Sequence, residues 1–148
     1  MNIKSYVNEV CSRARESSRE ISCINDVLKN AILKDLIEEI KASREHIKSE
    51  NNKDIEALKK NKSFIPSFID RLLLNDDRID GMINSIDEII AIDDPVGDIK
   101  DLKTMPSGIK VGKMSMPLGV IAMIYESRPN VTIDASALSI KSGNSIIL

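Results

Sequence analysis

The part of this sequence best suited to bind an anion is a short polar run, Tyr125-Glu126-Ser127-Arg128-Pro129-Asn130. It lies between a mostly apolar, β-rich run and a predicted helix. A helix N-terminus offers unpaired N–H groups and partial positive charge, and the forked guanidinium of Arg128 suits a phosphate or a carboxylate. The run therefore predicts an anion or cofactor site. The structural alternative is that Glu126 and Arg128 form a surface ion pair while Asn130 caps the helix.

Other reactive side chains are few, and their spacing predicts no chemistry. Cys11 and Cys23 form no metal-binding or redox motif, and they lie on or beside a predicted amphipathic helix. We expect both to be packing or surface residues and the lone His46 to be solvated. No metal site is expected, and the GxGxxG loop of a standard dinucleotide site is absent.

The elements around the polar run predict one βαβ unit. Leu118–Tyr125 is typical of a strand buried on both faces, Val131–Lys141 of a helix with Asp134 in its first turn, and Ser145–Leu148 of a second strand. Gly143 suits the helix C-terminus. Ligands of such sheets bind at the carboxyl ends of the strands, which is where the polar run lies.

The preceding part of the chain is predicted to be helical, with a hairpin before the βαβ unit. Apolar spacing indicates helices over Tyr6–Ile21, from Val27 through Ile40 to a polar stretch near Ser49–Asn52, from about Lys53 to before Pro66, over Pro66–Leu73, and over Ile79–Ile90. Pro95 follows the last of these helices and disfavours its continuation. The predicted hairpin pairs Ile99–Met105 with Ile109–Met114 across Pro106-Ser107-Gly108.

Together these elements predict an α/β fold, with a helical layer over about residues 1–94 and the hairpin and first βαβ unit over about 95–148. A parallel sheet of two strands cannot bury both of its faces. We therefore expect that the chain is incomplete, or that another chain completes its sheet.

Composition argues against several classes of partner. The chain has 148 residues, 21 Lys and Arg against 23 Asp and Glu, a net charge of -2 and only 3% aromatic residues. These values do not suggest a nucleic-acid surface, which needs basic patches and stacking aromatics. No apolar run approaches the ~20 residues of a membrane span, and the charged N-terminus is unlike a signal peptide. We expect a cytoplasmic, reduced protein.

A family resemblance rests on two longer stretches. Met116–Thr132, which contains Tyr-Glu-Ser-Arg-Pro-Asn-Val-Thr, and Lys141–Leu148 resemble the hallmark of gamma-glutamyl phosphate reductases, members of the aldehyde dehydrogenase superfamily. Weaker echoes are Asn52-Lys53-Asp54, Asp70-Arg71-Leu72, Asp94-Pro95-Val96-Gly97 and the segment from Gly108 to Gly112. The resemblance covers most of the chain from about Asn52.

The resemblance implies NADPH-dependent reduction of L-glutamyl 5-phosphate to L-glutamate 5-semialdehyde and phosphate, a step of proline biosynthesis. It also implies a Rossmann-type cofactor domain without the GxGxxG loop, of which residues 1–148 form the N-terminal part. The family's nucleophilic cysteine, which forms a thioester from the acyl phosphate, is expected beyond Leu148 together with the catalytic domain.

By motif position, Tyr125, Glu126, Ser127, Arg128 and Pro129 are expected to line the cofactor cleft. In this resemblance, either Asn130 or Arg128 takes the place of the asparagine that stabilises the oxyanion in related dehydrogenases. Arg128 also suits the substrate's phosphate or carboxylate. Lys141 is expected to serve as a partner of the helix dipole and not as a ligand.

Several interpretations stay open at this point. The chain is part of an enzyme, inactive alone, or one piece of a split enzyme whose other half is encoded separately. Alternatively, it is a non-catalytic interaction module, or it comes from a superfamily member that acts on another acyl substrate. The family resemblance admits a homo-oligomer or association with a missing C-terminal part.

Overall fold

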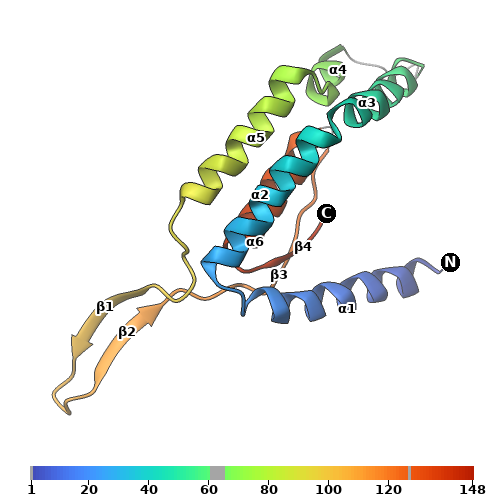
Figure 1. The fold of residues 1–148 in the computed structure, drawn as a ribbon. Helices are drawn as coiled ribbons and strands as arrows, with labels where there is room; N and C mark the ends of the chain where they lie inside the picture. The colour runs from blue at the N-terminus through green and yellow to red at the C-terminus, as the bar shows by residue number, and fades with distance from the viewer. Residues whose placement is uncertain (1, 61–65, 127) are drawn as a thin grey trace.

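Three helices form the centre of the molecule: α2 (Asp26–Ala42), α5 (Asp76–Ala91) and α6 (Pro129–Lys141). The computed structural model describes residues 2–60, 66–126 and 128–148. In Figure 1, α2 and α5 run side by side, and α6 packs against both of them. The predicted helical layer is therefore present, and the helix of the βαβ unit forms part of the same core.

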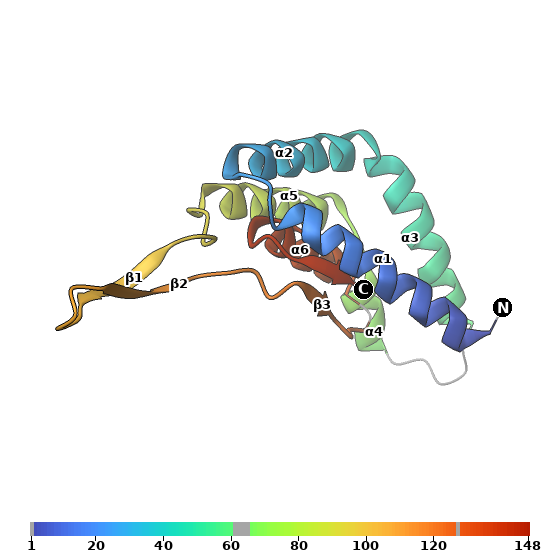
Figure 2. The same cartoon turned by 90° about the horizontal axis from the view of Figure 1, so that it is seen from below.

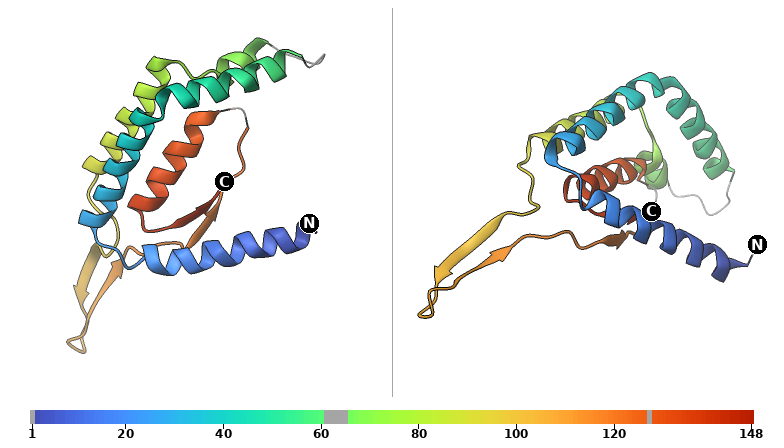
Figure 3. Two further views of the ribbon diagram at one scale, coloured as in Figure 1. Left: turned by 45° about the vertical axis from the view of Figure 1, so that its right-hand side comes forward. Right: turned by 60° about the horizontal axis from the view of Figure 1, so that its bottom comes forward.

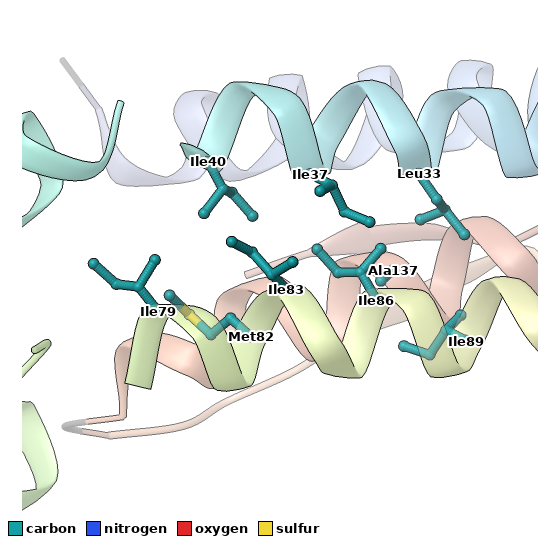
Figure 4. Close-up of a cluster of buried hydrophobic side chains, with 9 residues drawn as sticks. All are labelled: Leu33, Ile37, Ile40, Ile79, Met82, Ile83, Ile86, Ile89 and Ala137. Atoms are coloured by element: carbon teal, nitrogen blue, oxygen red, sulfur yellow. The ribbon is translucent and has the colours of Figure 1, made fainter. Parts of the chain in front are cut away.

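The core consists of aliphatic side chains at helical spacing, as Figure 4 shows. α5 contributes Ile79, Met82, Ile83, Ile86 and Ile89, which face Leu33, Ile37 and Ile40 of α2 and Ala137 of α6. Burial of one such large aliphatic side chain contributes about 1.5–3 kcal/mol. The predicted apolar face of α5 is thus confirmed, and it is the main source of hydrophobic stabilisation.

The ends of α2 and α5 follow from local capping chemistry. The Asn25 side chain accepts a hydrogen bond from the Leu28 N–H, and the Asn75 side chain accepts one from the Arg78 N–H. Each bond satisfies one of the unpaired N–H groups of the first turn. α5 ends at Ala91, shortly before Pro95, as predicted.

The boundary between the second and third helices differs from the prediction. α2 ends at Ala42 and α3 (Arg44–Lys59) begins directly after Ser43, whereas the sequence pattern places the break near Ser49–Asn52. After this break, α3 makes tertiary contacts with the start of α5. Arg44 and Lys48 form ion pairs with Asp76 at the start of α5. The hydrogen bond from Lys48, and to a lesser extent that from Arg44, lowers the pKa of Asp76.

A buried asparagine attaches α3 to the next turn of the chain. The Asn51 Nδ2 donates to the Leu72 carbonyl and its Oδ1 accepts from the Leu74 N–H, both at 2.8 Å. These bonds hold the end of α4 (Pro66–Leu72), a short helix that confirms the prediction for this segment. The predicted break before Pro66 falls on residues 61–65, which lie outside the described residues.

The βαβ unit is confirmed, with a shorter first strand than predicted. β3 (Val120–Ala122) pairs in parallel with β4 (Ser145–Ile147), and α6 connects them. Figure 3 shows α6 over one face of this sheet and α1 (Ile3–Ile21) along the other. Gly143 turns the chain between α6 and β4 with a φ of 71°, a conformation that suits glycine.

The expected burial of the first strand on both faces is wrong for the described residues. Leu118 is 84% exposed, and Val120, Met123 and Ile124 are also exposed. The reason is that β4 is the one described strand that pairs with β3, so the remaining edge and much of the apolar run have no cover.

The predicted hairpin is present and projects from the body. β1 (Ile99–Thr104) pairs antiparallel with β2 (Lys110–Met114), and Ile99 lies opposite Met114. Figure 2 shows both strands extending away from the helices, and every residue of the two strands is exposed.

Two buried lysines connect the core elements through ion pairs. Lys29, 1% exposed, lies 2.7 Å from Asp94 in the segment after α5. Lys141, 3% exposed, lies 2.6 Å from Asp26, and it also donates to Asn30 and to the Ile90 carbonyl. Lys141 does lie in the last turn of α6, as predicted, but its ammonium bonds to α2 and α5. A buried ammonium requires such partners because its desolvation is costly.

Within the described part of the chain, no helix combines the length and the apolarity that crossing a membrane would require.

Replacement of Asp94 by asparagine should destabilise the fold by about 3–5 kcal/mol near neutral pH, because it leaves the Lys29 ammonium buried without a counterion. Burial opposes ionisation of Asp94, but hydrogen bonds from Lys29 and from the Val96 N–H lower the pKa of Asp94 overall. This contribution is present above the ordinary pKa of 3.8 and is lost as pH falls through the lowered value.

Urea unfolding at pH 7 and near pH 2.5 measures both effects. The difference in the free energy of unfolding between the wild type and Asp94→Asn should be large at pH 7 and smaller near pH 2.5. Asp93→Asn, at an exposed neighbouring position, is the matched control. Equal losses of stability in Asp94→Asn and Asp93→Asn would contradict the stabilising role of the Lys29–Asp94 ion pair.

Candidate functional site

A cavity of about 540 Å³ lies where the start of α6 meets α4 and the first half of α5. This volume is in the range of small-molecule sites. Its lining combines charged side chains of both signs with a small apolar floor: Asp70, Arg71, Leu73, Leu74, Asp77, Arg78, Gly81, Met82, Ser85, Arg128, Pro129, Asn130 and Asp134. The cavity therefore suits a polar ligand that carries both charges.

The start of α6 forms one wall. Arg128 occupies the N-cap position in extended conformation, Pro129 is the first helical residue, and the Val131 N–H donates to the Arg128 carbonyl at 3.1 Å. The helix thus begins two residues before the predicted Val131, because a proline is well tolerated in the first turn. As a consequence, Asp134 lies in the second turn of α6 and not in the first.

The structure brings only part of the predicted site together. Arg128, Pro129 and Asn130 line the cavity, whereas Tyr125 and Glu126 do not. The Tyr125 hydroxyl lies 2.5 Å from Thr132 Oγ1, which attaches the end of the loop to α6. Ser127 lies outside the described residues.

The geometry does not favour the structural alternative for this loop. Among the described residues, Glu126 and Arg128 form no ion pair, and α6 has no side-chain cap. Asn130 Nδ2 instead donates to Asp134 Oδ2 at 3.2 Å, within the helix. Arg128 lines the cavity and makes no side-chain hydrogen bond to a described residue.

The opposite wall was not predicted from the sequence. Arg78 donates to Asp70 Oδ1 at 2.8 Å, to the Asp70 carbonyl, and to the Leu73 carbonyl at 2.9 Å, so it fixes the turn between α4 and α5. Arg71 lies over the Phe68 ring, with its guanidinium carbon 5.7 Å from the centroid. The one signal in the sequence is the family echo Asp70-Arg71-Leu72, which carries no information about a cavity.

Asp134 contains the most unusual polar atom of the site. Its Oδ1 is buried without a hydrogen-bond partner, the one such side-chain atom in the described part of the chain. An unpartnered buried oxygen costs about 1–3 kcal/mol, and more when it is charged. The atom has less than 1 Å² of accessible surface, so it is closed off from the open part of the cavity.

The remaining reactive side chains lie elsewhere. Cys11 and Cys23 are exposed free thiols and His46 is exposed, as predicted. The described residues contain no group of three or more His, Cys, Asp or Glu arranged to hold a metal ion.

Sequence comparison relates the chain to gamma-glutamyl phosphate reductases. A reductase of that name from Aquifex aeolicus is 46% identical over 143 residues, which is 97% of this chain and 33% of the relative. One from Ruthia magnifica subsp. Calyptogena magnifica is 46% identical over 147 residues, 99% of this chain and 35% of the relative. No protein-family model matches the sequence.

Solved structures agree with this relationship. The gamma-glutamyl phosphate reductase of Thermotoga maritima superposes with a TM-score of 0.88 at 36% identity, over 93% of this chain and 33% of that one. The gamma-glutamyl phosphate reductase of Saccharomyces cerevisiae superposes with a TM-score of 0.89 at 30% identity, over 95% of this chain and 35% of that one. The chain therefore spans about a third of the length of the relatives that it matches, and the predicted fold class is confirmed.

Gly81→Ala should stabilise the chain by about 0.4–1 kcal/mol, because glycine is unfavourable in a helix interior and the new methyl group meets no atom within 4 Å. Gly97→Ala should destabilise it, since Gly97 has a φ of 85°. Thermal unfolding of both variants checks the pair. A loss of stability in Gly81→Ala would contradict the open space beside Gly81.

Proposed function

Since this chain is homologous to the N-terminal portion of gamma-glutamyl phosphate reductases along nearly its whole length, we propose that it forms that portion of such an enzyme. The complete enzyme reduces L-glutamyl 5-phosphate to L-glutamate 5-semialdehyde and phosphate with NADPH, in the cytoplasm, as a step of proline biosynthesis. Residues 1–94 supply a helical layer and residues 95–148 the hairpin and first βαβ unit of its NADPH-binding domain.

The start of α6 supports the assignment of an anion site. No side chain caps this helix, so N–H groups of its first turn have no side-chain partner among the described residues. Such a helix end, with Arg128 beside it, fits a single phosphate group, and we assign that place to the acyl phosphate of the substrate. NADPH supplies a hydride to the reaction when it is bound. The chain's own contribution is to hold an anion at the carboxyl end of β3.

The single observation that carries the substrate assignment is the position of Arg128. Its side chain lines the cavity and makes no hydrogen bond to a described residue, whereas the amide of Asn130 is engaged with Asp134. Arg128 is therefore better placed than Asn130 to contact the acyl phosphate of the substrate. A forked guanidinium stabilises the charge of a phosphate or of a developing oxyanion.

The projecting hairpin favours a second candidate function, association with another chain. Apolar side chains remain exposed along both strands and the turn between them: Ile99, Leu102, Ile109, Val111 and Met114. A contiguous exposed apolar surface is typical of an interface. Association through this surface is compatible with the enzymatic proposal, either as a homo-oligomer or with a separately encoded C-terminal part.

A hybrid enzyme tests the proposed function. In it, residues 1–148 of this chain replace the matching segment of the Aquifex aeolicus relative, which is 46% identical. The hybrid should reduce NADP⁺ in the presence of glutamate 5-semialdehyde and phosphate, which is the reverse reaction. The 148-residue chain alone should show no turnover. A soluble, folded hybrid without turnover would sink the proposal, and turnover by the chain alone would contradict its role as one portion of an enzyme.

In the hybrid, Arg128→Ala should lower kcat/KM at least tenfold, about 1.4 kcal/mol or more, because it removes a contact to the reacting phosphate. Arg15→Ala on the exposed surface of α1 is the matched control and should leave kcat/KM unchanged. Unchanged turnover in Arg128→Ala would show that Arg128 is structural.

A further inference from the structure

We propose that the cavity between α4, α5 and α6 binds the amino-acid end of the substrate, with Asp134 accepting from its α-ammonium group and Arg71 donating to its α-carboxylate. This inference rests on the proposed function and adds a subsite that selects an α-amino acid over other acyl chains.

Asp134 identifies the ammonium position. It lines the cavity, its Oδ2 accepts from Asn130, and its Oδ1 is buried without a partner among the described residues. A carboxylate accepts hydrogen bonds at both oxygens, and Oδ1 has almost no accessible surface, so a cation in the cavity would meet this carboxylate at Oδ2, beside the amide of Asn130.

The spacing along α6 gives the orientation of the ligand. Arg128 at the N-cap and Asp134 are six positions apart, roughly 9 Å of axial rise at 1.5 Å per residue, and both line the cavity. The N-terminal end of α6 with Arg128 suits the anionic acyl phosphate, whereas Asp134 suits a cation. An extended glutamyl phosphate carries its ammonium and its phosphate at opposite ends, and it therefore matches this polarity when it lies along the helix.

Arg71 is the arginine of the opposite wall that is suited to the carboxylate. The neighbouring Arg78 is already engaged with Asp70 and the Leu73 carbonyl. Arg71 lies over Phe68, which restricts its orientation, and it has no ion pair among the described residues. A guanidinium binds a carboxylate through two parallel hydrogen bonds.

Gly81 leaves room for such a ligand between the two walls. A methyl group at position 81 would meet no atom within 4 Å, although Gly81 lies inside α5 and lines the cavity. An alanine would favour the helix, so the glycine trades stability for open space at this point.

Amide NMR titration of the full 148-residue chain tests the subsite directly. The probes are L-glutamate, glutarate, which lacks the ammonium, and 4-aminobutyrate, which lacks the α-carboxylate. L-Glutamate should shift the amide signals of α6 and of the α4–α5 turn and should bind at least tenfold more tightly than either analogue. Equal binding of glutarate and L-glutamate, or shifts confined to other elements, would overturn the proposal.

Two variants test which residue binds the ammonium group and which binds the α-carboxylate. Asp134→Asn should reduce the preference for L-glutamate over glutarate to about one, and Arg71→Ala should do the same for L-glutamate over 4-aminobutyrate. Asp87→Asn, on the exposed face of α5, and Arg15→Ala are the matched controls and should preserve both preferences. Retention of the preferences in Asp134→Asn and Arg71→Ala would overturn the assignment.

The titration is independent of turnover, so the two proposals fail separately. An inactive hybrid with selective glutamate binding would refute the reductase function and leave an amino-acid site. An active hybrid without selective binding by the chain would refute the subsite alone.

Discussion

The buried ion pairs of Lys29 and Lys141 are the constraint on which the rest of this structure depends. Each ammonium is almost fully removed from water, and each is compensated by a carboxylate from another element, Asp94 or Asp26. Neither charge can be left without its partner at low cost. Because the pairs join α2, the segment after α5 and the end of α6, the aliphatic core can form in one arrangement of these helices.

That arrangement explains why the cavity forms at the opposite end of α6. Lys141 fixes the C-terminal end of the helix against α2 and α5, whereas the N-terminal end reaches the turn between α4 and α5. The hydrogen bonds of Asn51 and Arg78 hold this turn in place. Rigid elements therefore position Arg128 and Asp134, although the loop before α6 is irregular. A site supported in this way suits a ligand whose charged ends must be held apart.

The same helix links the proposed function to the fold. In a βαβ unit, the helix N-terminus lies beside the carboxyl end of the preceding strand, and anions bind at that place. In the proposed function, the anionic group held there is the acyl phosphate of the substrate. Asp134 lines the same cavity, and its carboxylate offers a place for a cation, so we propose that the site suits an α-amino acid.

The sequence by itself determined the elements with strong local signals. The apolar period of α5, the asparagine caps, Gly143 and the β-rich run before Arg128 predict the helices and the βαβ unit, and the run from Met116 to Thr132 indicates the family. Tertiary structure alone decided the break at Ser43, the short and exposed β3, and the pairing of Lys141 with Asp26. It also decided the cavity, because Arg71 and Asp134 are distant in sequence and come to line one cavity only when α4, α5 and α6 pack. Local propensity carries no information about such contacts.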